Sequence, residues 1–247
     1  MRRFGLIGRT LGHSASARYF AEKFRREGIA GCRYDLFELA AIEELPRLLE
    51  RLPELCGFNV TIPYKQAVLP YLDAVSPEAA RIGAVNCVRR DGVRLTGYNT
   101  DAEGVRASLD GVLRGERPAR TLVCGTGGAA QAVRYVLEER GMAYDTVSRD
   151  PARGRYTYAA LTEETVAAAR LIVNATPLGT APRTDESPRL PYDALTAEHR
   201  LFDLVYNPPL TRFLEQGVRR GARILNGEVM LHAQAEAAWR IWNGDPE

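Results

Sequence analysis

A glycine-rich segment at residues 125–130 gives the clearest chemical signal in the sequence. It reads GTGGAA and follows an apolar run at 121–124. In this pattern the first glycine permits a tight turn, the second lets the backbone approach a pyrophosphate, and the small residue at 130 allows close helix–strand packing. The N-terminus of the following helix attracts the negative charge. The segment predicts a dinucleotide site, with a purely structural glycine turn as the alternative, and its candidate residues are Gly125, Thr126, Gly127, Gly128 and Ala129.

The end of the next predicted strand, at 144–147, bears on which dinucleotide binds. Ser148, Arg149 and Asp150 follow it. An acidic residue here binds the ribose 2′-hydroxyl of NAD, whereas an arginine accepts the 2′-phosphate of NADP. Arg149 therefore favours NADP, with Ser148 beside it. Asp150 opposes this interpretation because a carboxylate repels a phosphate, and a solvated Arg149–Asp150 surface pair is the alternative.

Four polar segments in the first hundred residues offer a substrate site. A nicotinamide-dependent enzyme needs a group that exchanges a proton with the substrate oxygen, and polar groups that hold the substrate close. Each segment also has a structural interpretation, such as helix capping by the serines and Asp101 or a surface position for Lys65. The segments are GHSAS at 12–16, NVTIPYK at 59–65, GAVN at 83–86 and GYNTD at 97–101.

Alternating strands and helices must position these segments. Strands are predicted at 4–7, 33–39 and 57–62, helices at 16–28 and 42–52, and a hairpin at 84–98 whose turn is the Asp91-Gly92 pair. A helix at 103–113 precedes a βαβ unit over 121–147. Further strands at 171–174, 201–205 and 222–225 and a helix at 230–242 complete the chain. This order predicts the α/β class.

The composition excludes several classes of protein. Hydrophobic residues make up 45% and charged residues 26% of the 247 residues, which is enough apolar material for a real core. The net charge is +2, and acidic and basic residues are interspersed along the chain, so we expect no nucleic acid and no membrane as partner. The four cysteines have no metal-ligand spacing, which indicates reduced thiols and no metal. No segment resembles a signal peptide or a membrane span, so a cytoplasmic location is expected.

Eight motifs, in order and at compatible spacings, resemble those of the shikimate dehydrogenase family. The resemblance runs from residue 5 to the final helix. The motifs are HSxS at 13–16, GFNVTIPYK at 57–65, GAVN at 83–86, NTD at 99–101, GTGGAA at 125–130, NATPLG at 174–179, DLVYNPPLT at 203–211 and MLHAQA at 230–235.

The resemblance implies an architecture and an activity. It implies two α/β domains: a substrate-binding and catalytic domain at 1–101 plus 230–247, and a Rossmann-type NADP-binding domain at 102–229. The C-terminal helix would return to the first domain. The implied activity is the reversible, NADPH-dependent reduction of 3-dehydroshikimate to shikimate in chorismate and aromatic amino-acid biosynthesis, by a monomer or homodimer.

The resemblance also implies roles for individual residues. Lys65 and Asp101 match the family's catalytic pair. As an ammonium, Lys65 can donate a proton to the carbonyl oxygen of 3-dehydroshikimate, with Asp101 orienting it. Ser14, Ser16 and Tyr206 match groups that hold the substrate carboxylate. The remaining matches are Asn59, Thr61, Asn86 and Gln234 for the ring hydroxyls, and Thr176 and Gly227 for the cofactor.

Three positions depart from the family pattern. Ala17 stands where the family usually has proline, Ser148-Arg149-Asp150 replaces the usual Asn-Arg-Thr or Asn-Arg-Ser, and Tyr98 stands where aspartate is often found. The second departure leaves room for a paralogue that uses NAD or prefers quinate. A non-catalytic dinucleotide-binding module on the same fold is the other alternative, and it would need a broken Lys65–Asp101 pair.

Overall fold

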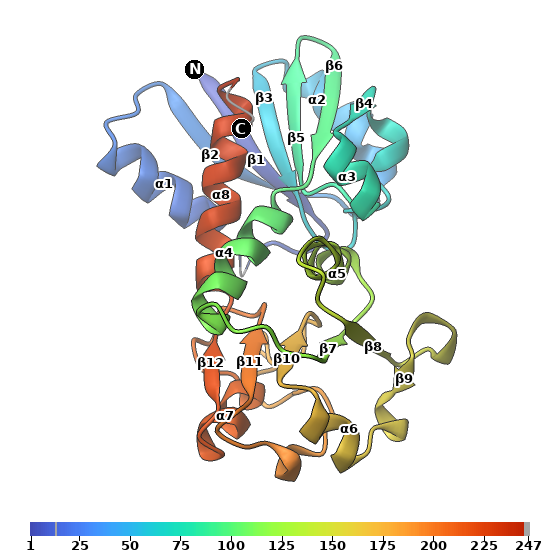
Figure 1. Ribbon diagram of the computed structural model, residues 1–247. Helices are drawn as coiled ribbons and strands as arrows, with labels where there is room; N and C mark the ends of the chain where they lie inside the picture. The colour runs from blue at the N-terminus through green and yellow to red at the C-terminus, as the bar shows by residue number, and fades with distance from the viewer. Residues whose placement is uncertain (13, 245–247) are drawn as a thin grey trace. The chain divides into compact units, whose positions relative to one another are not determined.

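The protein is described by a computed structural model that covers residues 1–12 and 14–244, so His13 of the HSxS motif lies outside the described residues. The chain forms two compact units, Met1–Thr100 with His232–Glu247, and Asp101–Leu231. Each unit contains a six-stranded sheet with helices (Figure 1). The predicted α/β fold class is therefore confirmed.

The sheet of the first unit combines parallel and antiparallel strands in the order β2-β1-β3-β5-β6-β4. Strands β1, β2 and β3 are parallel, and β5 runs antiparallel to β3 and β6. The strands are β1 Arg2–Gly8, β2 Cys32–Glu38, β3 Leu55–Val60, β4 Ala74–Val75, β5 Cys87–Asp91 and β6 Arg94–Tyr98. The helices are α1 Ser16–Arg26, α2 Leu45–Arg51 and α3 Pro77–Ile82, together with the later part of α8 Glu228–Trp242.

Alternation along the strands of the first unit builds a core on each face of the sheet. In β1, Phe4 packs into a cluster with α1 and α8, whereas Ile7, on the opposite face, packs into a cluster with α2. This is the period-two pattern of a strand that is buried on both faces. The predicted helix at 42–52 begins as a 3₁₀ turn, Ile42–Glu44, and becomes α-helical at Leu45. Pro46 accounts for the break, because its ring is tolerated only in the first turn of an α-helix.

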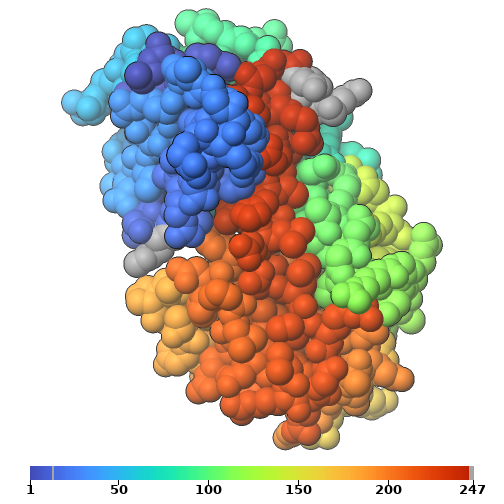
Figure 2. All heavy atoms as spheres, turned by 90° about the vertical axis from the view of Figure 1, so that its left-hand side faces the viewer, coloured from blue at the N-terminus to red at the C-terminus, as the bar shows by residue number. Residues whose placement is uncertain are grey.

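The C-terminal helix is packed into the first unit by its last turn. The Trp242 indole stacks on Phe4 at 4.8 Å between ring centroids and donates a hydrogen bond to the Val88 carbonyl at 3.0 Å. A Cβ on Gly57 would lie 2.4 Å from this indole, so only glycine fits there. The buried Lys23 of α1 pairs with Glu236 of α8 at 2.6 Å, and Figure 2 shows α1 in blue beside α8 in red.

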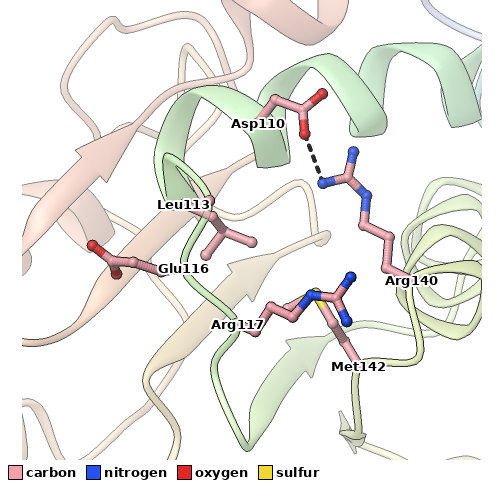
Figure 3. A pocket seen from close by; sticks show the side chains of 7 residues that line it. Asp110, Leu113, Glu116, Arg117, Arg140 and Met142 are labelled. Carbon is pink, nitrogen blue, oxygen red and sulfur yellow. Dashed lines mark hydrogen bonds and ion pairs between the residues drawn. The ribbon is translucent and has the colours of Figure 1, made fainter.

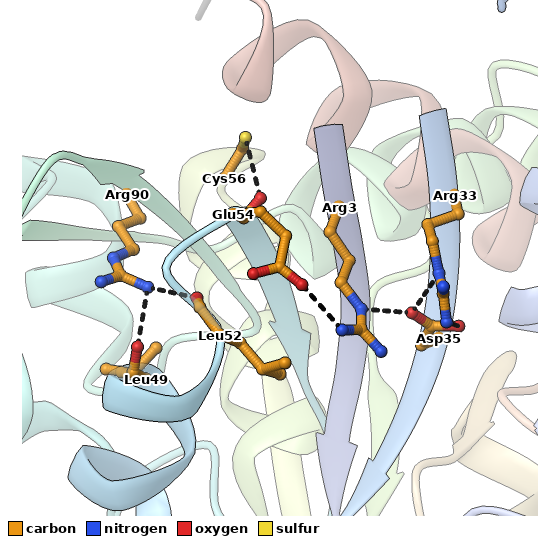
Figure 4. Close-up of polar contacts among 8 residues, drawn as sticks. All are labelled: Arg3, Arg33, Asp35, Leu49, Leu52, Glu54, Cys56 and Arg90. Atoms are coloured by element: carbon orange, nitrogen blue, oxygen red, sulfur yellow. Dashed lines mark hydrogen bonds and ion pairs between the residues drawn. The ribbon is translucent and has the colours of Figure 1, made fainter. Parts of the chain in front are cut away.

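Charged side chains join the amino ends of the first three strands of this sheet (Figure 4). Arg3 of β1 lies between Asp35 of β2 at 2.6 Å and Glu54 at 2.9 Å, just before β3. Arg90 of β5 donates to the Leu52 carbonyl at 2.8 Å. These contacts join the strands at the edge opposite to the carboxyl ends of β1 and β3.

The second unit is an all-parallel sheet in the order β12-β11-β10-β7-β8-β9. Counted along the chain, this is the Rossmann order, with its switch point between β7 and β10. The strands are β7 Thr121–Cys124, β8 Tyr144–Ser148, β9 Tyr156–Thr157, β10 Leu171–Asn174, β11 Arg200–Asp203 and β12 Arg223–Leu225. The helices are α4 Asp101–Leu113, α5 Gly128–Glu139, α6 Glu163–Ala168 and α7 Arg212–Arg219, with the start of α8.

The described residues contain neither a candidate membrane span nor a candidate metal site. Within 1–12 and 14–244, no helix has both the length and the apolar character of a membrane span. Nor do three or more His, Cys, Asp or Glu side chains gather in this part of the chain in a way that could hold a metal ion. The four cysteines, Cys32, Cys56, Cys87 and Cys124, are free thiols.

Candidate functional site

The predicted polar segments of the first unit meet at one edge of its sheet. Asn59 lies near the carboxyl end of β3, and the serines follow β1. Because β5 is antiparallel to β3, Asn86 just before β5 lies at this same edge, where Cys87 pairs with Asn59. Thr100 follows β6, which runs parallel to β3. Ligands bind at the carboxyl ends of strands in open α/β sheets, so the topology places these groups where a ligand is expected.

A buried hydrogen-bond network fixes the amide side chains at this edge. The Asn59 Nδ2 donates to the Asn86 carbonyl at 3.1 Å, and the Asn86 Nδ2 donates to the Thr100 Oγ1 at 3.0 Å. The Thr100 backbone N–H donates to the Asn86 Oδ1 at 2.6 Å. All three residues are at most 5% exposed. Buried polar groups with complete partners hold one orientation, so these amides form a preorganised polar surface.

The two serines lie at the start of α1. Ser16 is its first residue and is buried, while the half-buried Ser14 accepts a hydrogen bond from the Ser16 N–H at 3.2 Å through its Oγ. The N-cap position is Ala15, which makes no side-chain cap bond. Ser14 therefore caps the first N–H of α1 from the position before the N-cap, as the capping interpretation expects of one of the two serines.

The segment that carries Thr61 and Lys65 is held by backbone bonds to its neighbours. The Thr61 N–H donates to the Ile7 carbonyl at 2.9 Å, and the Lys65 carbonyl accepts from the Val85 N–H at 2.7 Å. Both side chains are half-buried. Gln234 is half-buried as well, one helical turn before the fully buried Ala238 on α8.

Asp101 and Tyr206 belong to the second unit. Asp101 is buried, is the first residue of α4, and follows Thr100 of the amide network directly in the chain. Tyr206 is half-buried in the loop after β11. The structure thus assigns seven of the predicted catalytic and substrate residues to the first unit and these two to the second: the seven are Ser14, Ser16, Asn59, Thr61, Lys65, Asn86 and Gln234.

In the second unit the glycine loop lies at the switch point of the Rossmann sheet. Gly125 has φ +115°, and a Cβ there would lie 3.0 Å from the Ala175 carbonyl oxygen and 3.2 Å from the Thr176 side chain. Gly127, the N-cap of α5, has an ordinary φ of −78° and open space where a Cβ would lie. Gly125 is therefore required by the fold, which brings Thr176 against the loop, whereas the backbone at Gly127 faces open space.

The segment after β8 shows how Asp150 and Arg149 divide their roles. The Asp150 Oδ1 accepts from the Ala152 N–H at 2.9 Å and caps the 3₁₀ turn Pro151–Arg153. The Asp150 N–H donates to the buried Ser148 Oγ at 3.0 Å. Arg149 is exposed and forms no ion pair with Asp150 among the described side chains. The predicted alternative, an Arg149–Asp150 surface pair, is not the arrangement that forms.

The buried carboxylate of Asp203 accepts hydrogen bonds from the end of β10 and from the segment after β11. Asp203, at the end of β11, accepts from the Thr211 Oγ1 at 2.6 Å, from the Asn174 Nδ2 at 2.9 Å and from the Val205 N–H at 3.0 Å. Burial raises the pKa of Asp203 to about 6, although these donors favour its charged form. Asn174 also accepts from the Thr176 hydroxyl at 2.6 Å. The sequence predicted no role for Asp203, although two signals were present: it opens the DLVYNPPLT motif, and it is an acidic residue within the otherwise apolar predicted strand at 201–205.

Gly227 lies just before α8 in the same unit. A Cβ there would lie 2.1 Å from the Leu204 carbonyl oxygen, and its N–H donates to the Val205 carbonyl at 3.0 Å. Close backbone packing is thus sufficient to require glycine at this position.

A pocket of about 340 Å³ in the second unit contains none of the predicted site residues. It lies between the carboxyl-terminal ends of α4 and α5 (Figure 3), whereas the glycine loop precedes the amino end of α5. Arg140 pairs with Asp110 across it at 2.8 Å. Both acidic and basic side chains line this pocket, and it is separate from the candidate site.

A Rossmann sheet with a glycine loop at its switch point, joined in one chain to an α/β unit with a preorganised polar edge, defines a dinucleotide-dependent dehydrogenase of the two-unit α/β class. The comparisons with known proteins specify the family. Residues 6–88 match the model of the shikimate dehydrogenase substrate binding domain. The chain is 39% identical to a shikimate dehydrogenase (NADP(+)) of Thermus thermophilus, over 99% of this chain and 93% of that protein. The chain belongs to the shikimate dehydrogenase family.

Solved structures agree with this assignment. The crystal structure of shikimate 5-dehydrogenase from another strain of Thermus thermophilus, in complex with NADP(H) and shikimate, matches with a TM-score of 0.86 at 37% identity, over 99% of this chain and 94% of that one. The quinate dehydrogenase of Corynebacterium glutamicum, in complex with NAD, matches with a TM-score of 0.87 at 30% identity, over 98% and 94%. The family resemblance identified from the motifs is confirmed.

Proposed function

We propose that this chain is an NADP-dependent shikimate dehydrogenase, which reversibly reduces 3-dehydroshikimate to shikimate in chorismate and aromatic amino-acid biosynthesis. The observation that carries this function is the buried hydrogen-bond network of Asn59, Asn86 and Thr100 at the carboxyl ends of β1 and β3. Lys65 lies in the segment that follows β3. A site built from fixed amides and hydroxyls recognises a polyhydroxylated ring and rejects rings that lack a hydroxyl. The relatives named NADP-dependent shikimate dehydrogenases support the same substrate.

The substrate carboxylate is held, in this proposal, by Ser14 and Ser16, with Tyr206 adding its phenol. Two observations support the serines. They lie at the amino end of α1, where the positive end of the helix dipole favours an anion, and Ser16 is the first residue of this helix. The ring hydroxyls are then read by Asn59, Thr61, Asn86 and Gln234.

Proton transfer is assigned to Lys65, with Asp101 orienting its ammonium group. When bound, NADPH supplies a hydride to the carbonyl carbon of 3-dehydroshikimate. Lys65 donates a proton from Nζ to the carbonyl oxygen, which becomes the hydroxyl of shikimate, and it takes the proton back in the reverse direction.

The cofactor is assigned to the glycine loop of the second unit. Gly125, Thr126, Gly127, Gly128 and Ala129 form the pyrophosphate turn, and Thr176 lies against it. Arg149 binds the 2′-phosphate, with Ser148 beside it. Asp150 does not pair with Arg149 in this proposal, because its carboxylate caps the following 3₁₀ turn. Gly227 completes the proposed lining. The domain roles follow: 1–101 plus 230–247 bind substrate, and 102–229 bind NADP.

The quinate- or NAD-preferring paralogue is disfavoured by this arrangement of Arg149, and the non-catalytic module by the presence of both Lys65 and Asp101. A cytoplasmic location is part of the proposal. So is the assembly as a monomer or homodimer whose partner is the small-molecule substrate, with no nucleic acid and no membrane.

The test is a set of initial rates with purified protein, crossing shikimate and quinate with NADP and NAD. Fast turnover with shikimate and NADP, at least about tenfold above the other three combinations in kcat/KM, is expected. Turnover that is faster with quinate or NAD would move the protein to the paralogue class. No turnover in any combination would leave only the binding module.

A further inference from the structure

A tyrosine that none of the motifs includes lies behind one of the proposed substrate-binding residues. Tyr34 is in the middle of β2, where it pairs with Phe4 of β1, while Leu6 of β1 pairs with Asn59 of β3. Phe4 and Leu6 face the same side of the sheet. On that side the Tyr34 phenol reaches across β1, and its hydroxyl donates to the Asn59 Oδ1 at 2.9 Å.

The Tyr34 ring is held in place independently of any ligand. It stacks on Phe20 of α1 at 4.4 Å between centroids with an interplanar angle of 14°, and Trp242 of α8 lies 6.2 Å away on its periphery. Burial raises the pKa of the Tyr34 phenol well above its usual value. The hydroxyl is therefore a fixed, neutral group between two helices and three strands.

Counting protons fixes the direction of each bond. The phenol has a single proton, which it donates to Asn59, and the Asn59 amide donates in turn to the Asn86 carbonyl. One hydroxyl thus sets the orientation of an amide on β3, because the amide oxygen must face the phenol and the amide nitrogen must face the Asn86 carbonyl.

We propose that Tyr34 is a positioning residue for substrate binding: its hydroxyl holds the Asn59 amide in one orientation, so that the amide is already placed to bind a ring hydroxyl of the substrate. The inference rests on the proposed function of Asn59. Without the Tyr34 hydroxyl, the Asn59 side chain gains freedom that binding must remove, and its Oδ1 loses its donor. Tyr34 touches no reacting atom, so the chemical step is unaffected.

The experiment compares Tyr34→Phe with a matched control in the full chain. Tyr34→Phe keeps the ring stack and should raise KM for shikimate about tenfold, with kcat within about twofold and KM for NADP unchanged. The control is Tyr192→Phe, which also loses one phenol–carbonyl hydrogen bond, to Pro188 at 2.5 Å, but in the second unit. Its KM for shikimate should stay at the wild-type value despite a similar loss of thermal stability.

A double-mutant cycle separates positioning from a general structural effect. The effects of Tyr34→Phe and Asn59→Ala on KM should be strongly non-additive, because the alanine already removes the acceptor. Equal KM values for Tyr34→Phe and Tyr192→Phe, or full additivity in the cycle, would overturn the positioning role. Wild-type protein without turnover of shikimate would instead overturn the proposed function, so the two failures are distinguishable.

A second measurement covers the case in which Tyr34→Phe does not fold. 3-Fluorotyrosine placed at position 34 keeps the ring and the hydroxyl. Its ¹⁹F resonance should shift on addition of shikimate, with a midpoint near the KM, and should not shift on addition of NADP alone. An unchanged resonance at saturating shikimate would contradict the proposal.

Discussion

The two proposed binding regions of this chain use different parts of the polypeptide. At the substrate edge of the first unit, the working groups are side chains whose hydrogen bonds are completed by other side chains, as in Asn86 with Thr100. At the cofactor loop of the second unit, the working groups are the backbone of residues 125–130 and the amino end of α5, and side chains are mostly missing. The substrate region is specified by its polar side chains, and the cofactor loop is specified by the small size of its side chains.

This difference follows from the ligands that the regions are proposed to bind. A small polyhydroxylated acid is recognised by matched donors and acceptors at fixed positions. A pyrophosphate is recognised by backbone N–H groups at close range and a helix dipole, so each Cβ is an obstacle. Removing side chains should therefore damage the first region, and adding them should damage the second.

The largest expected effect comes from removing one side chain of the first region. Only two of the 33 lysines and arginines in the chain are lysines, Lys23 and Lys65. Lys23 forms ion pairs with Glu27 and Glu236, a role that arginine can also fill. A guanidinium stays protonated in proteins and is a poor proton donor. Lys65→Ala should lower kcat on the order of 10³-fold in steady-state assays, with little change in KM for NADP.

Arginine substitutions make this test specific for proton transfer. Lys65→Arg keeps the positive charge and should lose nearly as much kcat as Lys65→Ala. Lys23→Arg keeps the ion pairs and should retain kcat. If Lys65→Arg retains most of the wild-type kcat, the side chain at this position acts through its charge alone, and the proton-transfer assignment is wrong.

Adding a methyl group to the cofactor loop should have the next largest effect. At Gly127 a Cβ meets no protein atom and φ is ordinary, so Gly127→Ala should fold with an unchanged Tm. It should nevertheless weaken NADP binding by roughly 10- to 100-fold, measured by calorimetry, because the methyl group occupies the approach of the pyrophosphate. Gly125→Ala provides the contrast, since its φ of +115° and its contact with Ala175 should lower Tm even without cofactor. Wild-type affinity in Gly127→Ala would show that the ligand does not approach this backbone.

Arg149 is the exception within the cofactor region, because its proposed role depends on a side chain. Arg149→Gln should raise KM for NADP about tenfold and leave KM for NAD unchanged, since only NADP carries the 2′-phosphate. Arg155→Gln is the matched control: Arg155 is exposed on the same segment but pairs with Asp145 at 3.1 Å. A similar rise for both cofactors would mean that Arg149 does not read the 2′-phosphate.

The sequence predicted those features whose causes are local. The glycine loop, the Asp91-Gly92 hairpin and the 3.6-residue pattern of α1 and α5 depend on residues that are close in the chain, and all are present in the structure. The Rossmann unit and the family followed from the spacing of such local motifs. The short helices α3, α6 and α7 were not predicted, because elements of six to eight residues depend on caps and tertiary packing more than on periodicity.

The rest of the site depends on contacts between distant residues. In the sequence Asp150 opposes NADP, whereas in the structure its carboxylate caps the following 3₁₀ turn. In the sequence, Tyr34 is one position of a predicted strand. That its hydroxyl donates to Asn59 depends on the register of three strands. The sequence predicted no role for Asp203, whose three donors come from separate segments. Hydrogen-bond partners are set by topology, so single-sequence reasoning could name the residues of the motifs but not what fixes them.

The smallest expected effect concerns the buried hydroxyl of Thr121 in the second unit. The Thr121 Oγ1, at the amino end of β7, is buried and has no hydrogen-bond partner within the part of the chain that the structure describes. An unsatisfied buried hydroxyl costs stability, whereas a methyl group of the same shape does not. Thr121→Val should stabilise the fold by about 1 kcal/mol, seen as a rise in Tm of roughly 2–4 °C by calorimetry. Because β7 presents its other end to the glycine loop, all kinetic constants should stay unchanged. A lower Tm in this variant would mean that the hydroxyl has a partner after all, and that the second unit, like the first, satisfies its buried side chains completely.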